Sequence, residues 1–211
     1  MRKAVIFDLD GTLANTDEVH KLAWELALQK MGYDVKVDIR YLLGRKTIDI
    51  AKILIGEINA EKLASVKTEI YNELVKTLAK PKPCVMELIK SLRNSKIPFA
   101  VVTSSMRHSA VQVLKVIKVE PDVLIAGDDV KIGKPNPMPV IEAIRKLNMD
   151  PNESIGIGDT IYDVMAYYSA GVREILLVKS SVPLNVEEVR KYNAKILDSL
   201  CEILDWFNFF I

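Results

Sequence analysis

The stretch Ala4-Val5-Ile6-Phe7 is followed directly by Asp8-Leu9-Asp10-Gly11-Thr12. Four apolar, mostly β-prone residues predict a strand that is buried on both faces. Side chains at alternate strand positions point the same way, so the Asp8 and Asp10 carboxylates can face one reaction centre. A bound cation would screen their mutual repulsion, and Gly11 allows a sharp turn. The stretch therefore has room for a nucleophile, a proton-transfer group and part of a metal site; the plainer alternative is a strand that ends in an Asp-Gly turn.

Three further apolar runs each lead into polar residues that suit phosphate chemistry. These are Phe99-Ala100-Val101-Val102 before Thr103-Ser104-Ser105, Val123-Leu124-Ile125-Ala126 before Lys134-Pro135, and Ser154-Ile155-Gly156-Ile157 before Gly158-Asp159-Thr160-Ile161-Tyr162-Asp163. In open α/β sheets, sites form at the carboxyl ends of parallel strands. We therefore expect the polar residues after all four runs to meet at one edge of a sheet.

The order of the expected elements predicts an α/β fold with a parallel sheet flanked by helices. Residues 16–80 look helical and show no strand-like alternation, and Lys80-Pro81-Lys82-Pro83 reads as a linker because proline is excluded from helix interiors. Beyond the linker, helices and strands alternate. Helices are expected near 84–94, 107–117, 137–147, 160–169 and 198–208, and strands near 97–103, 122–126, 154–158 and 174–178.

The four motifs resemble, in order and in strand context, those of the haloacid dehalogenase superfamily of phosphohydrolases. The motifs that carry the resemblance are Asp8-Leu9-Asp10-Gly11-Thr12, Thr103, Lys134-Pro135, and Gly158-Asp159 with Asp163. The branch of phosphoglycolate phosphatases and β-phosphoglucomutases is the most similar, and it carries a helical cap after the first strand. The resemblance implies a Rossmann-like core domain (residues 1–14 and 82–211) and a small all-helical cap domain (residues 15–81).

The resemblance also implies roles for the four acidic residues. Asp8 would attack phosphorus and form an aspartyl-phosphate. Asp10 would protonate the leaving oxygen and then accept a proton from water. Mg²⁺ would bind the Asp8 carboxylate, the Asp10 carbonyl and Asp159, all hard oxygen ligands, with Asp163 as an indirect partner. The alternative makes Asp159 a helix N-cap and Asp163 a solvated acid.

Three residues outside the acidic motifs would bind the phosphoryl group. Thr103 would donate a hydrogen bond to it, with help from Ser104, and Lys134 would neutralise charge on the phosphoryl group and on Asp8. Arg107, just after this loop, is a weaker candidate for the same group. A serine-rich turn and a plain surface lysine are the alternatives.

The cap contributes two further groups of candidates. His20 lies one helical turn before Trp24 and is as easily structural as functional. Gly44, Arg45 and Lys46 interrupt the helical pattern and resemble the specificity loop of this branch, where a cation could hold an anionic substrate group. A solvated basic loop is the alternative. We expect the cap to move on hinges near Ala14-Asn15 and the proline-containing linker.

Two sites in the sequence distinguish a phosphatase from a mutase of this branch. Mutases of this branch usually carry Glu-Asp-Ser where this chain has Gly158-Asp159-Thr160, and an arginine where it has Thr47. We therefore expect hydrolysis of a small phosphorylated metabolite, with a β-phosphoglucomutase-type mutase as the alternative. A phosphate-binding protein without catalysis is a further alternative, because a fold does not dictate function.

The composition limits the kinds of partner and the cellular location that we expect. The 211 residues include 29 basic and 28 acidic side chains and no long basic block, which argues against nucleic acid as a partner. No apolar stretch is long enough to span a membrane. Cys84 and Cys201 are isolated and suit reduced thiols in the cytoplasm better than a disulfide framework. We expect a cytoplasmic monomer or homodimer, with the aromatic stretch 205–211 as a core or dimer contact.

Overall fold

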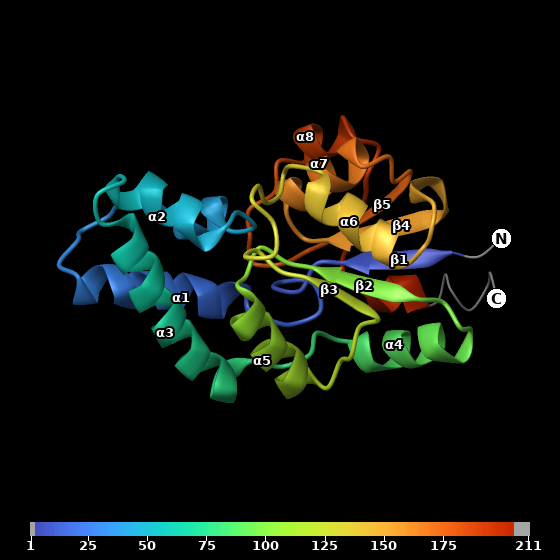
Figure 1. The fold of residues 1–211 in the computed structure, drawn as a ribbon, viewed down its shortest axis with the longest axis horizontal. Coiled ribbons are helices and arrows are strands. Elements are labelled where there is room, and N and C mark those ends of the chain that lie inside the picture. The colour runs from blue at the N-terminus through green and yellow to red at the C-terminus, as the bar shows by residue number, and fades with distance from the viewer. Residues whose placement is uncertain (1–2, 205–211) are drawn as a thin grey trace.

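The structure, a computed structural model, describes residues 3–204 and contains one six-stranded parallel sheet (Figure 1). The strand order is β3-β2-β1-β4-β5-β6. The strands are β1 (Ala4–Phe7), β2 (Phe99–Val102), β3 (Val123–Ile125), β4 (Ser154–Gly158), β5 (Glu174–Val178) and β6 (Lys195–Leu197). This arrangement confirms the expected Rossmann-like α/β fold, in which β1 lies centrally between β2 and β4.

Helices cover both faces of the sheet. Helices α6, α7 and α8 lie on one face, and α4 and α5 lie on the other (Figure 1). The helices are α1 (Asp17–Lys30), α2 (Thr47–Ile55), α3 (Ala60–Leu78), α4 (Val85–Asn94), α5 (Arg107–Ile117), α6 (Met138–Lys146), α7 (Ile161–Ser169) and α8 (Val186–Arg190), with short 3₁₀ turns η1 (Ile39–Leu42) and η2 (Pro151–Glu153). The sequence predicted neither α8 nor β6.

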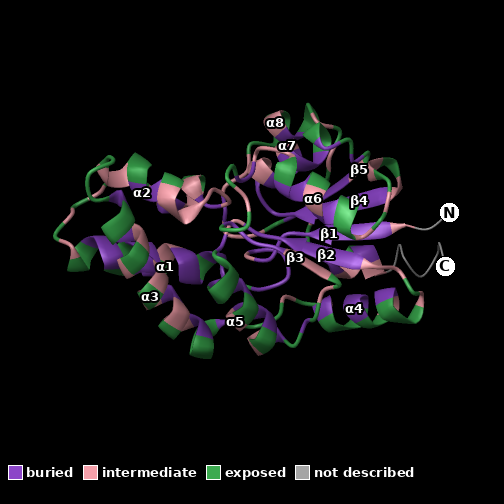
Figure 2. Ribbon diagram, in the orientation of Figure 1, coloured by how far each residue is buried: buried purple, intermediate pink, exposed green. Residues whose placement is uncertain are grey.

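The central strand is buried on both faces, as the apolar run predicted. Val5 and Phe7 point into the core layer under α4 and α5, and Ile6 points into the layer under α6 and α7. The alternation follows from the period of two in a strand. Figure 2 shows the result: the central strands β1, β2 and β4 are buried, whereas the helices around the sheet have exposed residues on their outer sides. The sheet is therefore a rigid frame that holds the strand ends in place.

Helices α1, α2 and α3 form a helical segment (residues 15–81) that lies beyond the carboxyl ends of the strands (Figure 1). All but one of the buried residues of one apolar cluster come from this segment, and Trp24 is fully buried in it; the exception is Val182. The two connections to the sheet run side by side, since the Asn15 amide donates to the Lys80 carbonyl at 3.0 Å and the Lys80 amide to Asn15 Oδ1 at 2.7 Å. The predicted hinges are therefore neighbours in space.

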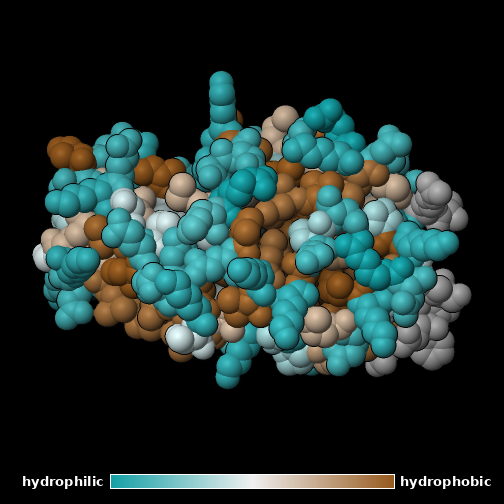
Figure 3. Space-filling model, turned by 60° about the horizontal axis from the view of Figure 1, so that its bottom comes forward, coloured by the Kyte–Doolittle hydropathy of each residue, from teal (hydrophilic) through white to brown (hydrophobic). Residues whose placement is uncertain are grey.

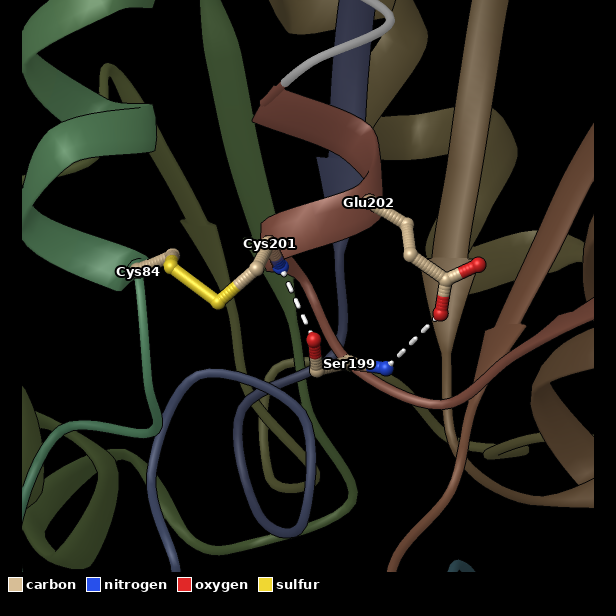
Figure 4. Close-up of a disulfide and its surroundings, with 4 residues drawn as sticks. All are labelled: Cys84, Ser199, Cys201 and Glu202. Carbon is tan, nitrogen blue, oxygen red and sulfur yellow. Dashed lines mark hydrogen bonds between the residues drawn. A yellow bond between two sulfur atoms is a disulfide. The ribbon is translucent and has the colours of Figure 1, made fainter.

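The two cysteines form a disulfide (Figure 4), so the expectation of two separate reduced thiols is wrong. Cys84 precedes α4, Cys201 lies in the helical turn at residues 201–204, and their Cα atoms are 5.1 Å apart. Both segments pack against the same face of the sheet, where Val85 and Leu200 share one apolar core. This proximity could not be read from the sequence, because 117 residues separate the two positions.

The aromatic stretch at 205–211 lies outside the described residues, so its expected contact stays a prediction. Among the described helices, none combines the length and the apolar character that a membrane-spanning segment needs. On the face shown in Figure 3, hydrophobic surface lies between numerous hydrophilic side chains.

Candidate active site

Polar side chains after neighbouring strands converge on one cavity of about 40 Å³. Asp8 follows β1, Thr103 follows β2, and Asp159 follows β4. The wall opposite these strand ends is built by the helical segment. The lining residues are Asp8, Asp10, Asp17, His20, Trp24, Leu43, Gly44, Arg45, Thr47, Ile50, Lys67, Thr103, Ser104, Ser105, Asp159, Thr160 and Val182. The structure thus brings together residues from both parts of the chain that the sequence singled out.

Three buried carboxylates cluster beside this cavity. Asp8, Asp159 and Asp163 each present an oxygen such that all three atoms lie within 4.8 Å of one another. Asp159 Oδ1 accepts a hydrogen bond from Thr12 at 3.1 Å, whereas Asp159 Oδ2 is buried and has no partner. Burial, and then the charges of Asp8 and Asp163, raise the pKa of Asp159 well above its ordinary value. An orphaned buried oxygen in an all-oxygen cluster fits a hard divalent cation.

Gly11 makes room for this arrangement. A Cβ at this position would lie 2.2 Å from Asp159 Oδ2, and φ is +84°, a conformation that suits glycine. The Asp-Gly step after β1 therefore lets the chain turn and also lets Asp159 approach the backbone.

Lys134 ties two of the carboxylates together. Its Nζ donates to Asp8 Oδ1 at 2.6 Å and to Asp163 Oδ1 at 2.5 Å, and the side chain is buried. Burial opposes the charge of Lys134, but Asp163 and Asp8 outweigh it and raise its pKa. Burial raises the pKa of Asp8 to about 8, although Lys134 pulls it down. A further cation would favour the ionised form of Asp8.

Asp163 points inward because it belongs to the cap of α7. Thr160 is the N-cap of the helix, and its amide and hydroxyl donate to Asp163 Oδ2 at 3.0 and 2.7 Å. This capping box fixes the carboxylate at the third position of the helix. Asp163 is fully buried, so the alternative of a solvated acid is wrong.

The Asp10 carboxylate turns away from the acidic cluster, towards hydroxyls and His20. Its Oδ1 accepts hydrogen bonds from Thr16 at 2.6 Å and Tyr71 at 2.7 Å and lies 3.2 Å from His20 Nε2, and its Oδ2 accepts from Ser105 at 2.7 Å. Burial would raise its pKa, but His20, Thr16 and Ser105 outweigh burial and lower it. Asp10 is ionised in this arrangement.

Sequence reasoning missed Lys67 and Tyr71. Both lie on α3, and Lys67 Nζ lies 2.6 Å from His20 Nδ1 while Tyr71 stacks on the His20 ring at 3.9 Å between centroids. The signal was present: Lys67 falls in the spacing of four that links Leu63, Tyr71 and Val75 on the buried side of the helix. A lysine inside an apolar stripe deserves a functional reading, since lysine is rarely fully buried.

The Gly44-Arg45-Lys46 loop contacts the loops after β2 and β3 and the first turn of α7. The Gly44 carbonyl accepts from Ser104 Oγ at 2.6 Å, and Arg45 Nε donates to the Tyr162 hydroxyl at 2.9 Å. Lys46 Nζ donates to the Val130 carbonyl at 3.0 Å and does not line the cavity. Arg45 and Lys46, which the sequence suggested as ligands for an anionic substrate group, therefore both have partners within the protein.

Of the candidates in and after the loop that follows β2, Thr103 lines the cavity and Arg107 does not. Thr103 Oγ1 lies in the cavity, 3.3 Å from Asp10 Oδ2, and accepts from the Ser105 amide at 3.1 Å. Arg107 instead pairs with Asp129 and donates to the Leu124 carbonyl at 3.0 Å. It is therefore held away from the cavity, and we drop it as a phosphate ligand.

Comparison with known proteins gives three kinds of likeness. A family model described as haloacid dehalogenase-like hydrolase matches residues 5–177. Pyrophosphatase PpaX of Halalkalibacterium halodurans is 32% identical over 173 residues, 80% of each chain. Validoxylamine A 7'-phosphate phosphatase of Streptomyces hygroscopicus subsp. limoneus is 33% identical over 184 residues, 82% of this chain and 84% of that protein. The crystal structure of a hydrolase from Pseudomonas syringae shares the fold, with a TM-score of 0.86 and 24% identity over 97% of this chain and 98% of the other.

Proposed function

The chain belongs to the haloacid dehalogenase-like hydrolase family and is a phosphoric monoester hydrolase, and from this premise we propose that it cleaves small phosphate monoesters with Mg²⁺ through an aspartyl-phosphate on Asp8. The observation that carries the proposal is the cluster of Asp8, Asp159 and Asp163 at the carboxyl ends of the strands, with Lys134 bridging two of its members. Phosphoglycolate and sugar phosphates are the substrate types we consider.

Asp8 is the nucleophile in this proposal. One of its oxygens attacks phosphorus in line, the bond from phosphorus to the leaving oxygen breaks, and the phosphoryl group is carried on Asp8. Lys134, 2.6 Å from Asp8, stabilises the negative charge that the nucleophile and phosphoryl group share. Thr103 and Ser104, which line the same cavity, supply hydrogen bonds to the phosphoryl oxygens.

Mg²⁺ would be held by the carboxylates of Asp8 and Asp159 and by the Asp10 backbone carbonyl, with Asp163 in support through Lys134 or water. When bound, the ion would neutralise charge on the phosphoryl group and favour the ionised nucleophile. The partnerless Asp159 Oδ2 supports this assignment, because a buried acceptor without a donor is the atom that a cation would satisfy.

Asp10 moves the protons. It donates a proton to the leaving oxygen, and in the second step it takes one from the water that attacks phosphorus and releases phosphate from Asp8. Its low pKa in this arrangement keeps the carboxylate ionised, which is the form that the second step needs. The His20–Lys67 pair beside it supports the proton-donating half of the cycle, because the pair holds a proton close to the Asp10 carboxylate.

We propose that the helical segment acts as a cap and that this structure represents its closed position. Its contacts with the loop after β2 and with α7, from Gly44 to Ser104 and from Arg45 to Tyr162, leave a catalytic cavity of only about 40 Å³. Closure excludes bulk water from the transfer step. The paired connections near Asn15 and Lys80 are the proposed hinges.

A phosphosugar mutase remains the second candidate, because the same nucleophile and acid could move a phosphoryl group between two hydroxyls. The mutase needs a grip on a second phosphate, and this chain has Thr47 where mutases carry an arginine. We therefore expect no conversion of β-glucose 1-phosphate to glucose 6-phosphate, with or without a bisphosphate primer. A third candidate, phosphate binding without turnover, conflicts with the full set of catalytic side chains.

Phosphate release from a panel of small monoesters, with Mg²⁺ or with EDTA, tests the proposed function. We expect turnover that needs both Mg²⁺ and Asp8, so that Asp8→Asn loses all measurable activity while it keeps the fold, as judged by circular dichroism. Turnover by Asp8→Asn at the wild-type rate would contradict the assignment of the nucleophile. Appearance of glucose 6-phosphate in a coupled assay would favour the mutase.

A further inference from the structure

A second and larger cavity adjoins the catalytic cavity. It has a volume of about 480 Å³ and lies between α3, the start of α2 and the loops after β2 and β3. Its lining residues are Lys46, Thr47, Ile48, Glu61, Ala64, Ser65, Thr68, Glu69, Ser104, Met106, Gly127 and Asp128. Ser104 and Thr47 line both cavities and therefore form their common wall.

We infer that the second cavity receives the leaving group of the substrate, and that this leaving group carries hydroxyl or amine groups but no second anionic group. The inference rests on the proposed function, since it takes the catalytic cavity as the place where the phosphoryl group reacts. It narrows the substrate class from small monoesters in general to those of polyols, sugars and amino sugars.

The size of the catalytic cavity carries the first step. A single water molecule needs roughly 10–15 Å³ of cavity volume. The catalytic cavity of about 40 Å³ therefore holds a few waters or little more than a phosphoryl group. With the helical segment in this position, a sugar-sized leaving group does not fit beside Asp8. The adjoining cavity is more than ten times larger, as the two volumes of about 40 and 480 Å³ show, and only the shared residues Ser104 and Thr47 lie between the two.

The lining of the second cavity carries more negative than positive charge. Three carboxylates line it, those of Glu61, Glu69 and Asp128, against one ammonium, that of Lys46. The Lys46 Nζ is already engaged by the carbonyls of Val130 and Lys131, at 3.0 and 3.4 Å. A second phosphate or a carboxylate placed here would meet three like charges, and the one ammonium in the lining is held by the two carbonyls.

Hydroxyl groups supply the recognition that remains. Thr47, Ser65, Thr68 and Ser104 line the cavity. Because the hydroxyls of Thr68 and Ser104 already donate to the Ala64 and Gly44 carbonyls, they are left as acceptors. Together with the carboxylates of Glu61 and Glu69, they can accept hydrogen bonds from sugar hydroxyls or an ammonium group. The leaving group that matches this lining is neutral or cationic. A carboxylate-bearing ester such as phosphoglycolate matches it poorly.

Three sugar 6-phosphates of similar size test the inference: glucosamine 6-phosphate, glucose 6-phosphate and 6-phosphogluconate, which differ in the charge of the leaving group. We expect kcat/KM with Mg²⁺ at pH 7 to be at least about tenfold lower for 6-phosphogluconate than for the other two. The double substitution Glu61→Lys with Glu69→Lys should shrink this ratio by about tenfold or more. Glu73→Lys, an exposed position on the same helix outside the cavity, should leave the ratio unchanged.

Acetyl phosphate, whose small leaving group does not need the second cavity, separates the two proposals. If acetyl phosphate is hydrolysed but the three sugar phosphates are turned over alike, the inference about the second cavity is overturned and the proposed function stands. A ratio that survives the double substitution also overturns it. If none of these substrates is hydrolysed, acetyl phosphate included, the proposed function fails and the inference with it.

Discussion

The Nζ of Lys67 on α3 lies 2.6 Å from Nδ1 of His20 on α1, and both side chains are buried. At this distance one nitrogen donates to the other, so the pair cannot carry two full charges without strong repulsion. Burial lowers the pKa of Lys67 to about 7, and burial together with Lys67 lowers the pKa of His20. The helical segment thus places one mobile proton beside Asp10.

Lys67 should make the stability of the protein depend on pH. An unfolded lysine keeps its proton up to its ordinary pKa of 10.5, whereas folded Lys67 loses it near 7. Between these values the unfolded chain binds more protons, so the free energy of unfolding rises with pH, by up to about 1.4 kcal/mol per pH unit from this group. Lys67→Met lacks this term. In denaturant unfolding, the free energy of unfolding of wild type should therefore rise relative to that of Lys67→Met between pH 7 and pH 9.5.

Lys62, an exposed lysine on the same helix, provides the control for that comparison. Lys62→Met should run parallel to wild type at both pH values. An equal difference between wild type and Lys67→Met at pH 7 and at 9.5 would mean that Lys67 keeps an ordinary pKa in the folded protein.

Asp159→Asn should stabilise the metal-free protein and remove its response to metal. The pKa of folded Asp159 is raised, so the folded state holds a proton that the unfolded state releases above about pH 4, and stability falls as pH rises through that window. An amide carries no such charge. In EDTA at pH 8 we expect Asp159→Asn to be more stable than wild type by on the order of 1 kcal/mol or more, and by less at pH 5.

The same pair of proteins reports on the cation. Mg²⁺ should raise the Tm of wild type by binding the folded state, and it should leave the Tm of Asp159→Asn unchanged. A melting temperature that rises equally in both proteins would place the bound ion somewhere other than the acidic cluster.

Gly44→Ala should impair catalysis more than it impairs folding. Gly44 has φ of +96°, and a Cβ there would lie 2.7 Å from Thr160 Oγ1, across the contact between the helical segment and the sheet. We expect at least a tenfold loss of kcat/KM. Gly56, also in the helical segment, has φ of +78° but nothing within 4 Å of a Cβ. Gly56→Ala should therefore have the same backbone cost of about 1 kcal/mol in stability, without a clash. Equal activity losses in the two variants would count against a closing cap.

The disulfide should contribute to stability through the length of chain that it closes. Cys84 and Cys201 are 117 residues apart, for which loop-closure entropy predicts an effect of up to about 4–5 kcal/mol. Dithiothreitol should lower the Tm of wild type to that of Cys84→Ser and should leave Cys84→Ser itself unaffected. If reduction leaves the wild-type Tm unchanged, the two thiols are not bonded in the protein as isolated.

The sequence predicted the frame of the molecule because the signals are local. The buried run before Asp8 and the turn at Gly11 are each contained in a few residues, and the boundaries expected for α5 agree with the structure. β6 escaped prediction because it is a three-residue edge strand that is only partly buried and carries no clear alternation. Short edge strands depend on their neighbour for definition.

Features that depend on tertiary proximity were harder to foresee. The disulfide joins two cysteines that meet only because their helices share one face of the sheet. Arg45 and Lys46 have the charge of anion ligands, but their partners, the Tyr162 hydroxyl and a loop carbonyl, lie more than eighty residues away. Lys67 could have been found from its place in an apolar stripe, whereas its contact with His20 requires the packing of α1 on α3.

The most direct test of the central claim is a search for phosphate on Asp8 itself. Asp10→Asn should slow the second step, so that acetyl phosphate, whose leaving group needs little protonation, loads the nucleophile faster than water clears it. Mass spectrometry of the acid-quenched protein should then find the mass of one phosphoryl group on the peptide that contains Asp8. The Asp8→Asn, Asp10→Asn double variant should show none. If wild type releases phosphate from the substrate while Asp8 is never phosphorylated in Asp10→Asn, the aspartyl-phosphate mechanism is wrong.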